Sequence, residues 1–150
     1  MPDETLIETK AIEVMDNFGK AYVFKVKVCN DYSHLLETVS LAFYVSYGTE
    51  PIVALTVYLV KDRNEFQNDC TAGWTFEIPE RMRNRGVGLS LWKALETIFQ
   101  EYRVSSLWGN IETINMTDTD IKKKINFWKK AGFDIVNDYE IHKTYTLSST

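Results

Sequence analysis

The chain has 150 residues and a mass of 17.4 kDa, which predicts one domain spanning residues 1–150. Hydrophobic residues make up 45% and charged residues 25%, a balance that excludes a disordered or fibrous protein. The net charge of −4 argues against a general nucleic-acid binder, which needs a surplus of Lys and Arg, and it favours cationic partners such as amines.

The cysteines and the N-terminus bear on location. Neither Cys29 nor Cys70 lies in a CxxC or Cys/His spacing, so we expect no structural metal and no disulfide framework, and a reducing cytoplasmic location is the simplest interpretation. The start MPDETLIETK lacks the basic and apolar parts of an export signal. The longest apolar run, residues 52–60, is too short to cross a bilayer as a helix.

The first half of the chain is predicted to form antiparallel strands. Residues 5–15 alternate apolar and polar side chains, residues 21–28 do so strictly, and residues 39–62 form a predicted hairpin that turns at YGTEP. Between the second and third strands, NDYSHLLET holds one short helix at most, with Asp31 or Ser33 as its N-cap.

The second half alternates strands with two helices. Its predicted elements, in chain order, are a polar loop at 62–69, a strand at 71–78, a helix from Gly86, a strand at 104–114, a helix at 117–132, and a closing strand or bent hairpin arm at 133–147. Apolar residues recur at helical spacing in the first helix, and Gly132 ends the second. This order predicts one mixed sheet with helices packed on it.

The stretch RMRNRGVGLS, residues 81–90, places three arginines and two glycines at the start of the first helix. A helix start exposes backbone N–H groups and a partial positive charge, so such a loop is suited to bind phosphate. The glycines let the backbone approach an anion, and the arginines could add charge-assisted hydrogen bonds. The Lys of a Walker loop is absent and GxGxxG is not completed, so neither nucleotide motif fits.

Residues 83–88, RNRGVG, match the pattern RxxGxG between the strand FEIPE and a long apolar helix. This element resembles the acyl-CoA loop of the GNAT superfamily of N-acetyltransferases. The segment FWKKAGF at 127–133 resembles the place where the family's penultimate helix passes into the next strand. The resemblance covers roughly residues 38–140 in element order. It implies an α+β (α/β three-layer) fold: a mixed, mostly antiparallel sheet with helices on both faces and a reduced N-terminal helical part.

The resemblance implies acetyl-CoA as the cofactor. In the family, backbone amides of the loop hold the CoA diphosphate, and the preceding strand pairs with the pantetheine arm. The cofactor-binding residues implied here are Phe76, Glu77, Ile78, Arg83, Asn84, Arg85, Gly86, Val87, Gly88 and Leu89. The implied activity is acetyl transfer by direct attack of a neutral amine, from a small molecule or a protein lysine, on the thioester.

Two residues of the family's usual chemistry are replaced. The position of its general-acid Tyr holds Trp128, whose indole cannot protonate a thiolate, and the position of its frequent carboxylate base falls near Ala72. Glu77 and Asp69 are therefore the catalytic candidates, and the open alternatives are Glu112, Asp118, Tyr139 and Tyr145.

These replacements favour a second hypothesis, a catalytically degenerate GNAT-fold binding module that acts through a protein partner. A third, acetylation of charged tRNA, is disfavoured by the acidic composition. The expected partner is an amine-bearing small molecule or a protein. A homodimer is compatible with the sequence, whereas neither nucleic acid nor a membrane is an expected partner.

Overall fold

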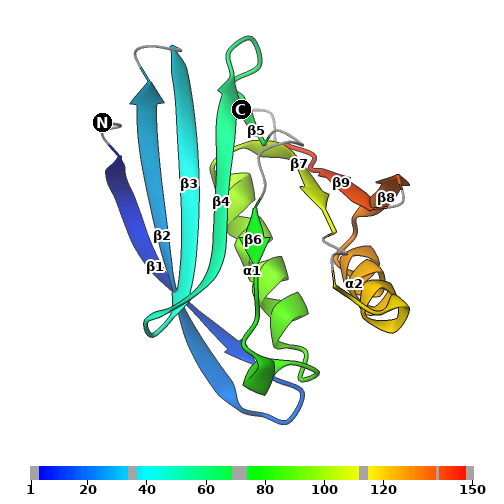
Figure 1. The fold of residues 1–150 in the computed structure, drawn as a ribbon. Helices are drawn as coiled ribbons and strands as arrows, with labels where there is room; N and C mark the ends of the chain where they lie inside the picture. The colour runs from blue at the N-terminus through cyan, green and yellow to red at the C-terminus, as the bar shows by residue number, and fades with distance from the viewer. Residues whose placement is uncertain (1–3, 34–36, 69–73, 112–114, 138, 148–150) are drawn as a thin grey trace.

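The computed structural model describes residues 4–33, 37–68, 74–111, 115–137 and 139–147 (Figure 1). The elements of these residues are β1 (Thr5–Met15), β2 (Ala21–Ser33), β3 (Thr38–Tyr47), β4 (Glu50–Val60), β5 (Glu65–Gln67), β6 (Thr75–Phe76), the 3-10 helix η1 (Glu80–Met82), α1 (Val87–Glu101), β7 (Val104–Asn110), α2 (Asp118–Lys130), β8 (Asp134–Asn137) and β9 (Glu140–Thr144). No helix among them is long and apolar enough to cross a membrane.

The described strands form one nine-stranded sheet in the order β1-β2-β3-β4-β5-β7-β9-β8, with β6 added beside β4. Only β5 and β7 run parallel, and the other described pairs are antiparallel. The sheet is therefore mixed and mostly antiparallel, and with its helices it confirms the predicted α+β class.

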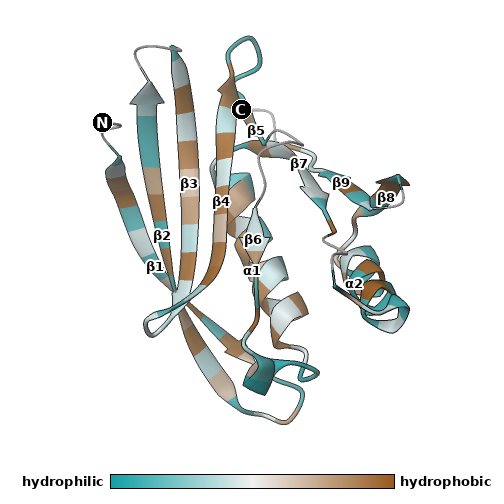
Figure 2. Cartoon of the chain, in the orientation of Figure 1, coloured by the Kyte–Doolittle hydropathy of each residue, from teal (hydrophilic) through white to brown (hydrophobic). Residues whose placement is uncertain are grey.

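The alternation in the first four strands gives the sheet one buried side. Every second residue of β2 from Tyr22 to Val28 is buried, and Phe43 of β3 lies on the same side. α1 covers this side, where the rings of Phe43 and Phe99 lie 5.0 Å apart. Figure 2 shows the alternation as brown and teal bands along the strands. Burial of these large side chains is the dominant favourable contribution to folding.

The segment after the second strand, predicted to hold one short helix at most, forms no helix in its described residues, and the assignment of Asp31 or Ser33 as an N-cap is wrong. β2 continues through Ser33, and β3 begins at Thr38, so Asp31 and Ser33 pair with β3 and cap no helix. Pairing with β3 gives the backbone N–H and C=O groups of these residues hydrogen-bond partners. A single helical turn would leave more of these groups unpaired, and short helices form at a cost. Residues 34–36 lie outside the described residues.

The polar loop predicted at 62–69 contains a strand. β5 pairs with β4 on one edge and with β7 on the other, and so joins the two halves of the sheet. Its three residues are too few to show a strand pattern, and the pairing with β4 and with the distant β7 stabilises it. Of the strand predicted at 71–78, only Thr75–Phe76 pair as β6 among the described residues, and the strand predicted at 104–114 ends at Asn110. Both predicted helices are confirmed, as α1 and α2. The closing segment is the β8–β9 hairpin, and Thr117 caps α2 by accepting from the amide of Asp120 at 3.2 Å.

Both helices pack on the same side of the sheet. The rings of Trp92 on α1 and Trp128 on α2 lie 5.2 Å apart. No helix of the described residues covers the other side of β1–β4, where Val23, Tyr44 and Tyr58 are exposed. This differs from the expected helices on both faces, because β2 passes almost directly into β3. The N-terminal helical part is reduced, as the resemblance implied.

Candidate functional site

The N-terminal end of α1 has open backbone donors. Gly86, the residue before the helix, has a φ of 82°, and no side chain caps the first turn. The amide of Ser90 donates to the carbonyl of Gly86 at 3.2 Å. Among the described residues, the amides of Val87, Gly88 and Leu89 have no acceptor. Together with the partial positive charge of a helix start, these donors suit an anion.

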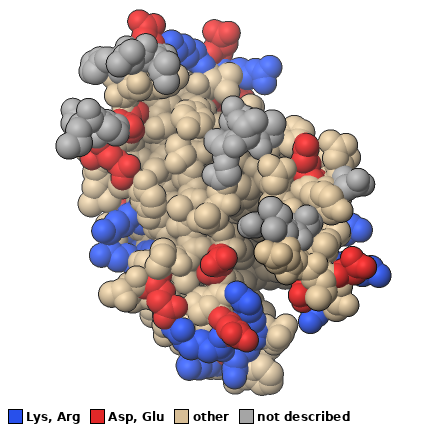
Figure 3. Space-filling model, in the orientation of Figure 1, with Lys and Arg blue, Asp and Glu red and all other residues tan. Residues whose placement is uncertain are grey.

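The three arginines of the loop already have protein partners. Arg81 pairs with Glu50 at 2.5 Å, and Arg85 pairs with Asp16 at 3.3 Å. Arg83 donates through Nε to a main-chain carbonyl of the preceding segment at 2.9 Å. Figure 3 shows basic and acidic side chains mixed at the lower end of the molecule, where η1 and the β1–β2 turn lie in Figure 1. The loop therefore offers a phosphate its backbone amides more than unpaired positive charge.

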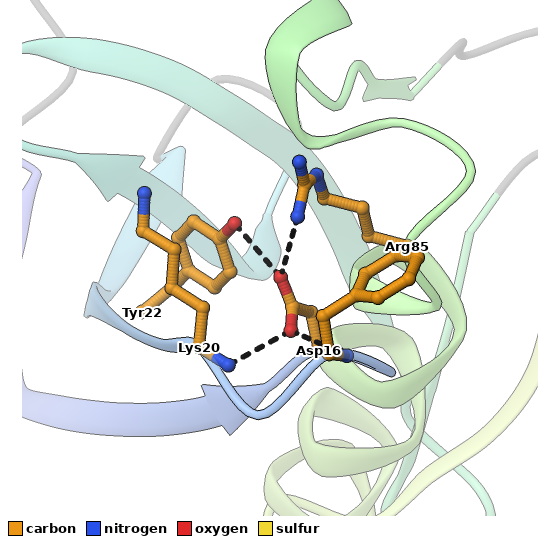
Figure 4. Close-up of polar contacts among 5 residues, drawn as sticks. Asp16, Lys20, Tyr22 and Arg85 are labelled. Carbon is orange, nitrogen blue, oxygen red and sulfur yellow. Dashed lines mark hydrogen bonds and ion pairs between the residues drawn. The ribbon is translucent and has the colours of Figure 1, made fainter.

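Asp16 is the centre of a buried polar network beside the loop (Figure 4). Its side chain is 0% exposed. Oδ1 accepts from the amides of Phe18 and Lys20 at 2.8 and 2.9 Å, and Oδ2 accepts from the hydroxyl of Tyr22 at 3.1 Å and from Arg85 at 3.3 Å. Burial alone would raise the pKa of Asp16, but these hydrogen bonds outweigh it and the pKa is lowered. The carboxylate thus stays ionised and holds the β1–β2 turn against the loop.

Protein packing also accounts for both glycines of the loop. A Cβ at Gly86 would lie 2.6 Å from Oδ1 of Asn17. A Cβ at Gly88 would lie 3.1 Å from the ring of Phe127 and 3.3 Å from Ile78. The sequence interpretation assigned these glycines to anion approach, and the structure adds that neighbouring segments occupy the space that their side chains would take.

Strand β6, which precedes the loop in the chain, diverges from β7, which follows α1. β7 pairs with β5, and the side chain of Asn68 prolongs that pairing: Nδ2 donates to the carbonyl of Trp108 and Oδ1 accepts from its amide, both at 2.6 Å. β6 pairs with β4 and with no other strand of the described residues. We call this divergence the β6–β7 fork; Figure 1 shows β6 beside β4 and away from β7.

One edge of β6 pairs with β4, and the backbone groups of its other edge face the fork. The amide of Glu77 donates to the carbonyl of Ile52 in β4 at 2.9 Å. Because successive residues of a strand direct their backbone groups to opposite edges, the amide of Phe76 faces the fork. The side chain of Glu77 is exposed, and Ile78 is buried.

Aromatic side chains fill the fork. The indole of Trp74 lies against Gly109 of β7, where an added Cβ would be 2.2 Å from its Nε1. The same indole lies 4.8 Å from the ring of Trp92 and 4.9 Å from that of Trp128, and Phe76 lies 5.6 Å from both. Trp128 is thus part of a packed aromatic cluster.

The structure describes only one of the two catalytic candidates. Glu77 is exposed beside β6, and Asp69 lies outside the described residues, as do Ala72 and Glu112. Among the alternatives, Asp118 is exposed in the first turn of α2 and Tyr139 is exposed, while the hydroxyl of Tyr145 donates to Glu96 at 2.5 Å. Within the described residues, no group of three His, Cys, Asp or Glu could hold a metal ion.

Sequence reasoning missed Asp16, Asn17 and the role of Trp74. The stretch DNFG at 16–19 predicts a turn, since Asp and Gly favour turns. Nothing local in that stretch indicates that the turn meets Arg85 far along the chain. The sequence neighbours of Trp74 do not show that its side chain lies between two diverging strands.

Comparison with known proteins supports the fold. No protein-family model matches the sequence, and no curated protein matches it. Among solved structures, the GNAT domain of S. lividans PAT is similar, with a TM-score of 0.55 over 90% of this chain and 97% of that domain. The chain has the GNAT fold. At 11% identity this likeness establishes the fold alone, and it extends over more of the chain than the two sequence motifs.

Proposed function

We propose that the chain binds acetyl-CoA and transfers the acetyl group to an amine of a small molecule or of a protein. The observation that supports this most is the position of the uncapped start of α1 directly after the β6–β7 fork, in a GNAT fold. The open amides at the start of α1 suit a diphosphate. The β6–β7 fork suits an extended arm that pairs with a strand edge.

Backbone groups would do most of the binding. The open amides of Val87, Gly88 and Leu89 would hold the diphosphate, and the amide of Phe76 would bond to a carbonyl of the pantetheine arm. When bound, acetyl-CoA supplies a thioester that a neutral amine can attack. Glu77 would accept the proton of the amine through water, because its carboxylate is exposed beside the same strand edge.

Acetyl transfer can be tested by measuring thiol release from acetyl-CoA with polyamines, aminoglycosides and a lysine-rich protein as acceptors. Ser90 is exposed in the fourth position of α1, and helical side chains lean toward the N-terminus. Ser90→Glu would place a carboxylate over the open amides and repel the diphosphate, while Ser90→Gln has nearly the same shape without the charge. We expect turnover to fall at least about tenfold in Ser90→Glu and to persist in Ser90→Gln. Equal turnover in both variants would argue against the assigned diphosphate position.

A binding module without transferase activity is the second candidate. The burial of Trp128 within an aromatic cluster favours it, because no described proton donor takes the place of the usual Tyr. This candidate predicts that acetyl-CoA binds and that no acceptor releases thiol. Partner, acceptor and cytoplasmic location stay predictions under both candidates.

A further inference from the structure

Trp92 carries a buried donor with no acceptor. Its side chain is 0% exposed in the middle of α1, and its Nε1 has no hydrogen-bond partner among the described residues. Most buried polar groups in proteins are paired, since an unpaired donor loses its hydrogen bond to water on folding and gains nothing in return. An orphaned indole N–H therefore needs an explanation.

The described surroundings of Trp92 offer no good acceptor. The rings of Trp74, Phe76, Phe99, Trp128 and Phe133 lie between 4.8 and 5.8 Å from its ring centroid. The ring of Trp128 is perpendicular to that of Trp92, at 89°, and so offers a weak N–H···π contact at most. A leucine or phenylalanine would fill such an apolar site without an unpaired N–H.

Trp92 also forms one wall of the β6–β7 fork. Two of its ring neighbours, Trp74 and Phe76, belong to the β6 segment, and the indole of Trp74 lies on Gly109 of β7. Within the described residues, packing against Gly109 and neighbouring rings holds the side chain of Trp74, with no hydrogen bond to it. Its indole can therefore leave the fork without breaking a hydrogen bond, and its departure would open the space next to Trp92.

We propose that Trp92 is a ligand-positioning residue whose Nε1–H donates to a carbonyl oxygen of the acyl-pantetheine arm. The arm would take the place of the Trp74 indole between β6 and β7, so that its amide or thioester carbonyl meets the donor that the described residues leave unpaired. This inference rests on the proposed function, since it needs acyl-CoA in the fork.

Trp92→Phe tests the proposal, because it removes the N–H and keeps an aromatic ring. We expect this variant to resist denaturant about as well as the wild type, since an unpaired donor is lost, and to bind acetyl-CoA about tenfold more weakly by calorimetry. Trp108→Phe is the matched control: it removes an indole that stacks on His142, and it should bind as the wild type does.

The binding results distinguish a failure of this inference from a failure of the proposed function. If Trp92→Phe binds acetyl-CoA as tightly as the wild type, the inference is wrong and the proposed function stands. If the wild type itself binds no acetyl-CoA, the proposed function fails and the inference fails with it.

A second measurement needs no variant at position 92. In nitrogen-15-labelled wild type, the indole signal of Trp92 should move downfield on titration with acetyl-CoA, and Trp→Phe changes at the other three tryptophans identify it by elimination. An indole signal of Trp92 that does not move at saturation would overturn the proposal.

Discussion

Asn17 and Gly86 lie in direct contact, although one belongs to the β1–β2 turn and the other to the start of α1. The amide of Asn17 donates to the carbonyl of Arg85 at 2.8 Å, and its side chain occupies the place of a Cβ at Gly86. With the Asp16–Arg85 ion pair, this contact fixes the loop from which the open amides of α1 project. The first hairpin thus supports the candidate binding site.

Gly86→Ala is expected to destabilise the protein for two reasons. A left-handed backbone costs a non-glycine residue roughly 1–2 kcal/mol, and the new Cβ would clash with Asn17. Asn17→Ala removes the clashing atoms, so the double variant should regain the clash part and keep the backbone part. Free energies of unfolding from denaturant titrations measure both. Equal losses in the single and double variants would contradict the contact.

Asp16→Asn is expected to lower stability at pH 7 and to have less effect in acid. The pKa of Asp16 is lowered in the folded state, so its contribution is present above its unfolded pKa of about 3.9 and is lost as the pH falls through the folded value. The difference in unfolding free energy between the wild type and Asp16→Asn should therefore shrink between pH 7 and pH 3. Asp62→Asn, at an exposed position, is the control and should be neutral at pH 7. A difference independent of pH would contradict an ionised Asp16.

Gly109→Ala is expected to push the Trp74 indole out of the fork, because the added Cβ would lie 2.2 Å from Nε1. Overpacking of this kind costs about 1–3 kcal/mol, and tryptophan fluorescence should report the movement. In a Trp74→Ala background the same change should cost little, because the clashing ring is absent. A large cost of Gly109→Ala in both backgrounds would contradict the contact.

Glu96, Lys143 and Tyr145 are expected to act as one unit between α1 and β9. Oε2 of Glu96 forms an ion pair with Nζ of Lys143 at 2.6 Å and accepts from the hydroxyl of Tyr145 at 2.5 Å. Lys143 also donates to the carbonyl of Ala131 after α2. Burial, followed by the bond to Glu96, raises the pKa of Tyr145, which keeps its hydroxyl a donor. Lys143→Met should cost about 1–3 kcal/mol. In a double-mutant cycle with Glu96→Gln the losses should not add, whereas additive losses would contradict the coupling.

The sequence predicts those elements whose signal is local. The strict alternation of β2 and the apolar spacing of α1 each bury one face, so both elements follow from nearby residues. β5 could not be found in this way, because the stretch EFQ is a strand only through its pairing with β4 and β7. Asp31 and Ser33 have the chemistry of helix caps, and the register with β3 outweighs it.

The same limit applies to the candidate site. The start of α1 could be predicted as a candidate anion site, because the glycines and the following apolar helix are contiguous in the sequence. The support by Asp16 and the filling of the fork by Trp74 depend on segments that meet only in the folded chain. The orphaned N–H of Trp92 likewise depends on its neighbours in space.

Calorimetric titration of the full chain with acetyl-CoA tests the central claim most directly. The account predicts saturable binding at one site, with a Kd in roughly the 1 μM–1 mM range typical of enzyme substrates, and at least about tenfold weaker binding in Ser90→Glu than in Ser90→Gln. A titration without binding heat, together with no thermal stabilisation by acetyl-CoA at about 1 mM, would contradict it, since a ligand of the folded state must stabilise that state.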